Sequence, residues 1–194
     1  MPEPKLPQSS FEKKPLTIFA MDAPNVDASF GLILNRAPLP AERMRMDVLI
    51  KWLRQKAHSN NSRLYAKIFV NRPIEEDAWE KQLGWILVIQ NMGYDVYSKP
   101  RATADSDVDE DIVDYLYQLT EAHEVAEIVL ASNDSQRFHN ILEILACNGV
   151  KVTILGFNEF PSILTRNELF EFVPYSSIPG LMPATGCQTE SQAT

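Results

Sequence analysis

The feature that most constrains the fold is the alternation of short apolar runs with helical patterns along most of the chain. The first run, LTIFAMD at 16–22, is apolar on both faces and ends on an aspartate. Such a run is typical of a central strand in a parallel sheet, because both faces of that strand are covered. Parallel strands also need crossover segments, which helices usually supply. The alternation therefore predicts an α/β protein with a mainly parallel sheet and helices on both faces, a three-layer αβα arrangement.

The expected strands cover 16–22, 63–70, 94–97, 128–132, 151–156 and 170–173, and the expected helices cover 41–57, 75–91, 108–119 and 137–148. Within the helix at 75–91, the spacing of Trp79, Leu83, Ile86 and Leu87 predicts one buried stripe. Residues 23–40 are expected to form a long connection between the first strand and its helix. Long connections at this edge of a sheet are often functional.

Composition is consistent with one globular domain. The chain has 194 residues, of which 45% are hydrophobic and 23% are charged, enough for a full hydrophobic core. The polar segments 1–14 and 175–194 are expected to be mobile tails around a domain at 15–174. No apolar run approaches the roughly 18 residues of a membrane helix, and the start of the chain lacks the apolar core of a signal peptide. We therefore expect a cytoplasmic protein without a membrane segment.

The formal net charge of −8 is unevenly distributed. Residues 1–101 hold 15 Lys and Arg against 11 Asp and Glu, a balance of +4, whereas residues 102–194 hold 3 against 15, a balance of −12. An acidic pI of about 4.9 argues against a broad nucleic-acid surface, because neutralising phosphates requires clustered Lys and Arg. A local basic surface remains compatible with this composition.

Three aspartates stand where a parallel sheet places chemistry. Asp22 ends the first strand, Asp134 follows the strand at 128–132, and Asp109 begins a helix on its inward stripe. The carboxyl ends of parallel strands share one edge, so the three acids could converge there. A buried unpaired charge costs several kcal/mol, which favours a functional role. The structural alternatives are an Asx turn at Asp22, a helix-dipole acid at Asp109 and an N-cap at Asp134.

Three sequence blocks resemble the signature of a known family. MDAPNVD, SDVDEDIVDYL and LASNDSQRF, followed by ILEILACNGVKVTILGF, resemble the NYN domain and in particular its LabA-like branch. The resemblance covers residues 16–173. The matching positions are Asp22 and Asn25 in the first block, Val108 and Asp109 in the second, and Ser132, Asp134 and Phe138 in the third.

The resemblance implies a PIN-like fold and a metal-dependent ribonuclease. Asp22, Asp109 and Asp134 would then hold Mg²⁺ or Mn²⁺, and single-stranded RNA would be the substrate whose phosphodiester bonds are hydrolysed. Further contacts to phosphate, to metal-bound water or to a base are expected from Asn25, Phe30, Arg36, Asn133 and Ser135.

The chain departs from the family pattern at the third block. Asn133 replaces a glycine, Gln136 stands where a second aspartate would fall, and Arg137 is an extra residue. The alternative interpretation is therefore a weakened or inactive PIN-like regulator that acts through protein or RNA binding. A Rossmann dinucleotide binder would need a glycine-rich turn, which DAPNVD lacks. A haloacid-dehalogenase-type phosphatase would need a second aspartate two residues after Asp22, where this chain has Pro24.

Overall fold

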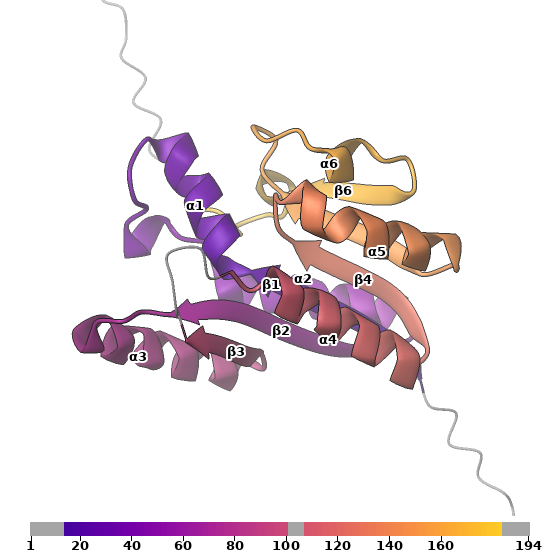
Figure 1. Ribbon diagram of the computed structural model, residues 1–194, viewed down its shortest axis with the longest axis horizontal. Coiled ribbons are helices and arrows are strands. Elements are labelled where there is room, and N and C mark those ends of the chain that lie inside the picture. Colours follow the sequence, from indigo (N-terminus) through magenta and orange to yellow (C-terminus); the bar gives the residue numbers. More distant parts are fainter. Residues whose placement is uncertain (1–13, 101–106, 184–194) are drawn as a thin grey trace, which may run out of the picture.

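The computed structural model describes residues 14–100 and 107–183. Strands and helices alternate along the chain (Figure 1). The strands are β1 (Leu16–Asp22), β2 (Arg63–Arg72), β3 (Asp95–Pro100), β4 (Val125–Ala131), β5 (Lys151–Gly156) and β6 (Phe170–Pro174). The α-helices are α1 (Ala23–Leu34), α2 (Met46–Ser59), α3 (Glu76–Met92), α4 (Asp109–Ala122), α5 (Ser135–Cys147) and α6 (Ile163–Arg166), with 3₁₀ turns at Pro40–Glu42 and Tyr175–Ser177.

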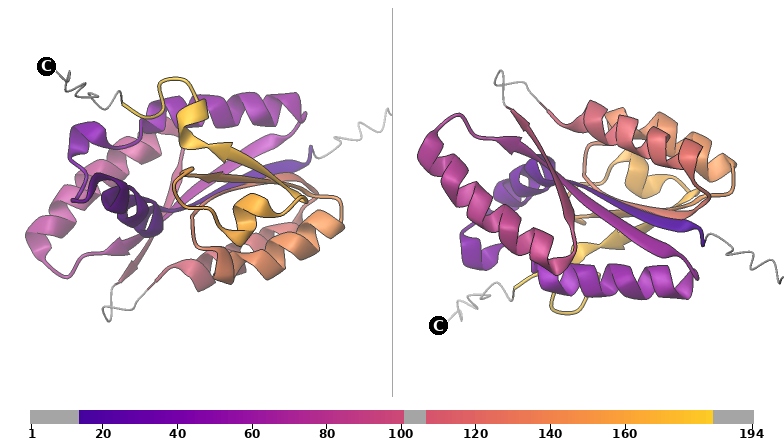
Figure 2. Two further views of the ribbon diagram at one scale, coloured as in Figure 1. Left: turned by 90° about the horizontal axis from the view of Figure 1, so that it is seen from above. Right: turned by 90° about the horizontal axis from the view of Figure 1, so that it is seen from below.

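The six strands form one sheet in the order β3-β2-β1-β4-β5-β6, and every pair of neighbours is parallel. Helices cover both faces, so the sheet lies between two helical layers (Figure 2). Phe19 and Met21 face the core under α1, α2 and α3, whereas Ile18 and Ala20 face the core under α4 and α5. The predicted three-layer αβα fold with a parallel sheet is confirmed.

Strand β1 occupies an interior position, as its sequence predicts. All seven of its residues are buried, and it pairs with β2 on one side and β4 on the other. In this register Asp22 lies opposite Phe69 and the preceding Met21 lies opposite Ala131. The acid at the end of β1 is therefore flanked by the carboxyl ends of both neighbouring strands.

The expected long connection at 23–40 is wrong, because most of it is helix α1. Its start and stop are encoded locally: Asp22 caps the helix, Pro24 lies in its first turn, and Asn35 ends it in the left-handed region at φ 53°. Proline in a first turn and asparagine at a left-handed C-cap are standard helix signals. Val26 and Phe30 then form its buried stripe.

The predicted buried stripe of α3 is also wrong in part. Leu83 and Leu87 are 38% and 60% exposed, whereas Ile86 and Ile89 are buried. The helix is apolar on more than one face, so periodicity alone does not select the face that packs. Helix α2 begins at Met46, later than expected, after the 3₁₀ turn at Pro40–Glu42.

Residues 1–13, 101–106 and 184–194 lie outside the described structure, and most of the two expected tails falls there. The described part of the expected C-terminal tail packs against the core, since Tyr175, Ile178 and Leu181 are each no more than 4% exposed. Packed structure thus continues beyond residue 174. Within residues 14–100 and 107–183, no helix combines the length and the hydropathy needed to span a bilayer.

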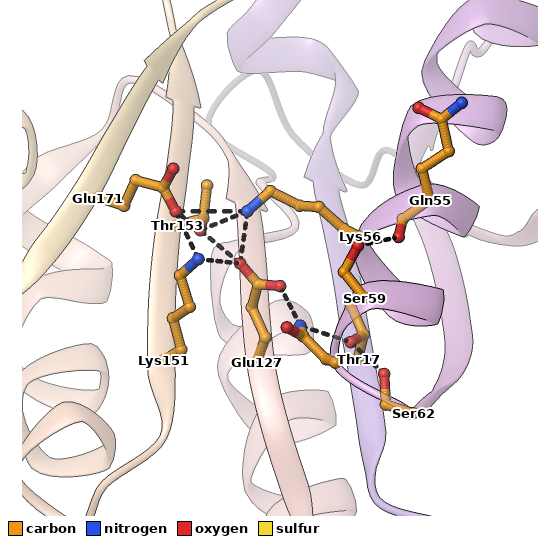
Figure 3. Close-up of polar contacts among 10 residues, drawn as sticks. Thr17, Gln55, Lys56, Ser59, Ser62, Glu127, Lys151, Thr153 and Glu171 are labelled. Atoms are coloured by element: carbon orange, nitrogen blue, oxygen red, sulfur yellow. Dashed lines mark hydrogen bonds and ion pairs between the residues drawn. The ribbon is translucent and has the colours of Figure 1, made fainter.

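A buried carboxylate fastens α2 to the sheet (Figure 3). Glu127 of β4 is fully buried, and its Oε1 lies 2.7 Å from the Lys56 Nζ and accepts a 2.6 Å hydrogen bond from the Thr153 hydroxyl. Its Oε2 accepts a 2.6 Å hydrogen bond from the Asn60 amide. In the sheet register Glu127 lies opposite Thr17, which is near the start of β1, and Asp22 lies at the other end of that strand. Both oxygens are satisfied, as a buried charge requires.

Removing the closest cation of Glu127 should destabilise the fold. In Lys56→Met this carboxylate stays buried, and the closest remaining cation among the described residues is the half-exposed Lys151 at 3.6 Å. We expect a loss of about 3 kcal/mol in the free energy of unfolding. Lys51→Met on the same helix, at a lysine 71% exposed, should cost less than about 0.5 kcal/mol. Urea unfolding measures both. Equal losses in the two variants would contradict the assigned role of Lys56.

Candidate active site

The carboxylate of Asp22 lies at the junction of β1 and α1. Its Oδ1 accepts a 3.1 Å hydrogen bond from the Asn25 backbone N–H, which caps α1, and its Oδ2 accepts a 3.2 Å hydrogen bond from the Ser132 hydroxyl. The residue is only 3% exposed. Burial raises the pKa of Asp22 to about 6, although both hydrogen bonds oppose that shift. The Asx-type contact is therefore present, but it does not offset the cost of burying the ionised carboxylate.

Asp109 is the first residue of α4 and is 6% exposed. Its pKa is raised to about 7, chiefly by burial and in smaller part by the negative charges of Asp22, Asp107 and Asp134. The structure thus brings together the three acids that lie far apart in the sequence.

Asp134 caps the other helix that begins at this edge. Its Oδ1 accepts a 3.0 Å hydrogen bond from the Gln136 N–H at the start of α5, and its own N–H donates to the Ser132 hydroxyl oxygen at 3.1 Å. The Ser132 hydroxyl therefore connects the Asp22 carboxylate to the backbone of Asp134. Ser132 is 1% exposed, so one buried side chain links the acids that cap α1 and α5.

Amide side chains join the first turn of α1 to the segments that follow β4 and β5. The Asn25 Oδ1 accepts a 2.8 Å hydrogen bond from the Asn133 N–H, and the Asn133 Oδ1 accepts a 3.3 Å hydrogen bond from the Phe157 N–H. Asn133 can lie there because residue 156 is glycine: a Cβ at Gly156 would be 2.8 Å from the Asn133 Oδ1. Gly156 was missed in the sequence, although a glycine ending a strand indicates a close approach.

The remaining predicted contacts are more scattered. The Arg36 guanidinium donates two hydrogen bonds to Glu42, at 2.7 and 2.5 Å, and lies outside the cleft described below. Phe30 is buried and stacks on Phe157 with 5.5 Å between ring centroids. Ser135 is the first residue of α5, and its side chain lies outside the described structure. Gln136 is exposed and does not line the cleft.

A cleft of about 1020 Å³ opens over the acids. Asp22, Asp109 and Asp134 contribute to its lining, and residues of β2, α3 and the segment at 40–46 line it as well. The volume is at the upper end of the range usual for ligand sites. The acids therefore face a space large enough for part of a polymeric substrate.

The donor set can be compared with what a metal ion requires. Among the described residues, no three or more His, Cys, Asp and Glu side chains form a group arranged to hold a metal. Asp22 and Asp134 each use one oxygen as a helix cap, and the Arg137 Nε lies 3.9 Å from Asp109. Mg²⁺ needs only one or two carboxylates, because it retains waters and binds substrate oxygens. The adjacent, mutually repelling Asp22 and Asp109 fit such an ion.

The three-layer arrangement of helices around an all-parallel six-stranded sheet is consistent with a PIN-like fold. The profile of the NYN domain matches residues 17–175, and the chain belongs to the NYN domain family. NYN domains form a PIN-like nuclease family whose members generally bind RNA and use divalent metals. A crystal structure of a protein of unknown function from Vibrio parahaemolyticus shares this fold, with a TM-score of 0.63, 18% identity, and coverage of 84% of this chain and 94% of that one. No curated protein matches the chain significantly.

Neutralising Asp109 should stabilise the fold above neutral pH. Because the pKa of this carboxyl is about 7 in the folded state, against an ordinary 3.8, stability is lost as the pH rises from about 4 to about 7, and the full cost of the ionised carboxylate is present above about pH 7. Asp109→Asn should therefore raise the free energy of unfolding by roughly 1–3 kcal/mol at about pH 8 in the presence of a chelator. The gain should shrink as the pH falls and disappear near about pH 3, where the wild-type carboxyl is largely protonated in both states.

The matched control for this comparison is Asp114→Asn, an exposed acid on the same helix. Urea unfolding of the two variants and the wild type at both pH values separates a general charge effect from the buried site. A loss of stability in Asp109→Asn at the higher pH would contradict the electrostatic description of the edge.

Proposed function

We propose that this protein is a metal-dependent ribonuclease of the LabA-like branch, in which Asp22 and Asp109 bind Mg²⁺ or Mn²⁺ and Asp134 completes the acidic active site beside them. The observation that carries the proposal is the convergence of these acids in one large cleft, with the pKa values of Asp22 and Asp109 raised. Acids with raised pKa values in a cleft are typical of functional sites. Membership of the NYN family points to RNA as the substrate.

The chemistry assigned to the site is hydrolysis of a phosphodiester bond. A divalent ion, when bound, would polarise the scissile phosphate and lower the pKa of a coordinated water. Asp22 and Asp109 supply the negative charge that binds the ion, and Ser132 orients the Asp22 carboxylate through its hydroxyl. Asn25 and Asn133 hold the loops of the edge in register. The backbone N–H groups at the start of α5 lie where an anionic phosphate is favoured.

The affinity for Mn²⁺ should increase with pH. The metal binds ionised carboxylates, so the protons held by Asp22 and Asp109, whose pKa values are about 6 and about 7, must first be released. We expect the dissociation constant measured by calorimetry to fall roughly tenfold or more between about pH 6 and pH 8. An affinity independent of pH over this range would show that these two acids do not bind the ion.

Substituting Asp22 should abolish both metal binding and cleavage. We expect Asp22→Asn to reduce the cleavage of labelled single-stranded RNA in Mn²⁺ by about 100-fold or more, because it removes a charge at the reacting phosphate. Asp47→Asn, at an acid of α2 that pairs with Arg45 on the surface, is the control and should cleave like the wild type. Equal cleavage by all three proteins would overturn the proposed active site.

One observation favours the alternative of a regulatory protein without catalysis. The Arg137 guanidinium, at the position that is extra relative to the family, lies 3.9 Å from the Asp109 carboxylate and competes there with a cation. Calorimetry distinguishes the two functions. Negligible Mn²⁺ heats for the wild type and Asp22→Asn alike would indicate a scaffold with no working metal site.

A further inference from the structure

The cleft over the acids is also lined by three basic residues, Arg43, Arg72 and Lys81. Arg43 pairs with Asp27 at 3.2 Å. Arg72 and Lys81 make no ion pair with a carboxylate among the described residues, and the Arg72 guanidinium lies instead over the Trp79 ring, 4.5 Å from its centroid. Two cations therefore line the same cleft as the acids without neutralising them.

These two cations come from one wall of the cleft. Arg72 is the last residue of β2, three residues beyond Phe69, which lies opposite Asp22 in the sheet register. Lys81 lies on α3, and its neighbour Gln82 donates a 3.0 Å hydrogen bond to the Asn71 carbonyl oxygen at the end of β2. That hydrogen bond fastens α3 to the strand. The wall formed by β2 and α3 thus holds two cations beside the acids of the cleft.

A ligand suited to this cleft must satisfy both kinds of charge. A phosphodiester strand does so, because a cation on the acids can bind one phosphate while neighbouring phosphates meet Arg or Lys. Met44 and Trp85 line the same cleft and offer apolar surface against which unstacked bases can pack. An acidic peptide would satisfy the basic wall, yet it would offer no reacting group to the acids.

We propose that Arg72 and Lys81 form the phosphate track of this protein, which binds an unpaired RNA strand on the side of the scissile bond that faces β2 and α3. The assignment rests on the proposed function, since it places the reacting phosphate at the acids. It adds two residues that lie outside the signature blocks. It also accounts for a local basic surface in a protein whose pI is about 4.9.

The test measures RNA affinity and its dependence on salt. Fluorescence anisotropy follows a fluorescein-labelled oligouridylate, with Ca²⁺ replacing Mn²⁺ to slow cleavage. Arg72→Ala and Lys81→Ala should each weaken binding about fivefold to tenfold and reduce the slope of log affinity against log salt by about one. Arg72→Lys and Lys81→Arg should retain most of the affinity, because the charge is kept.

Matched controls distinguish a specific effect of the phosphate track from a general effect of removing a positive charge. Arg63→Ala removes an arginine from the opposite end of β2, where it lies over the Tyr65 ring at 5.9 Å, and Lys51→Ala removes an exposed lysine of α2. Both should bind RNA with the wild-type affinity and salt slope. Calorimetry should give wild-type Mn²⁺ affinity for Arg72→Ala and Lys81→Ala, since neither residue is assigned to the metal.

The outcomes distinguish this inference from the proposed function. Wild-type cleavage together with unchanged affinity and salt slope in Arg72→Ala and Lys81→Ala would overturn the track and leave the ribonuclease intact. A second outcome is that the wild type binds RNA but does not cleave it, and that only Arg72→Ala and Lys81→Ala bind RNA more weakly. That result would support the track and overturn the catalytic proposal. Binding of an acidic peptide but not of RNA would overturn the track.

Discussion

Parallel pairing of β1 on both of its sides is the constraint on which the rest of the structure depends. A strand with parallel neighbours on both sides must leave the sheet through a crossover, so α1 begins directly where β1 ends. Asp22 occupies that junction, and its side chain serves the helix as a cap. The ends of β4 and β5 meet at the same edge, where Ser132, Asn25 and Asn133 join the loops by hydrogen bonds.

Two buried carboxylate environments in this domain differ in how the negative charge is balanced. Glu127 is surrounded by Lys56, Asn60 and Thr153, which satisfy both of its oxygens. Asp22 and Asp109 are nearly as buried, yet the cation that the described residues place closest to them is Arg137, at 3.9 Å from Asp109. Their pKa values rise accordingly. The negative charge is therefore balanced near the start of β1 and left unbalanced at its end, an arrangement that suits the proposed binding of a cation there.

Much of the architecture and the acidic site was predictable from local patterns. The strands at 16–22 and 151–156 were predicted at their observed bounds, since apolar runs with clear ends leave little choice. Asp109 was placed on an inward helical stripe by its spacing from Ile112 and Leu116, and all three are buried. Helix α1 was not predicted, although Pro24 and Asn35 mark its ends. The length of the segment favoured a long connection, whereas the residues at its ends favour a helix.

The sequence by itself determined the strand pattern, the parallel class of sheet and the three acids, because these depend on periodicity and on where each strand ends. Only the tertiary structure decided which face of α3 is buried, how Gly156 makes room for Asn133, and that Arg72 and Lys81 share a cleft with the acids. Those features depend on contacts between residues remote in sequence. The sequence specifies the chemistry of each side chain, whereas the sheet register determines which side chains are in contact.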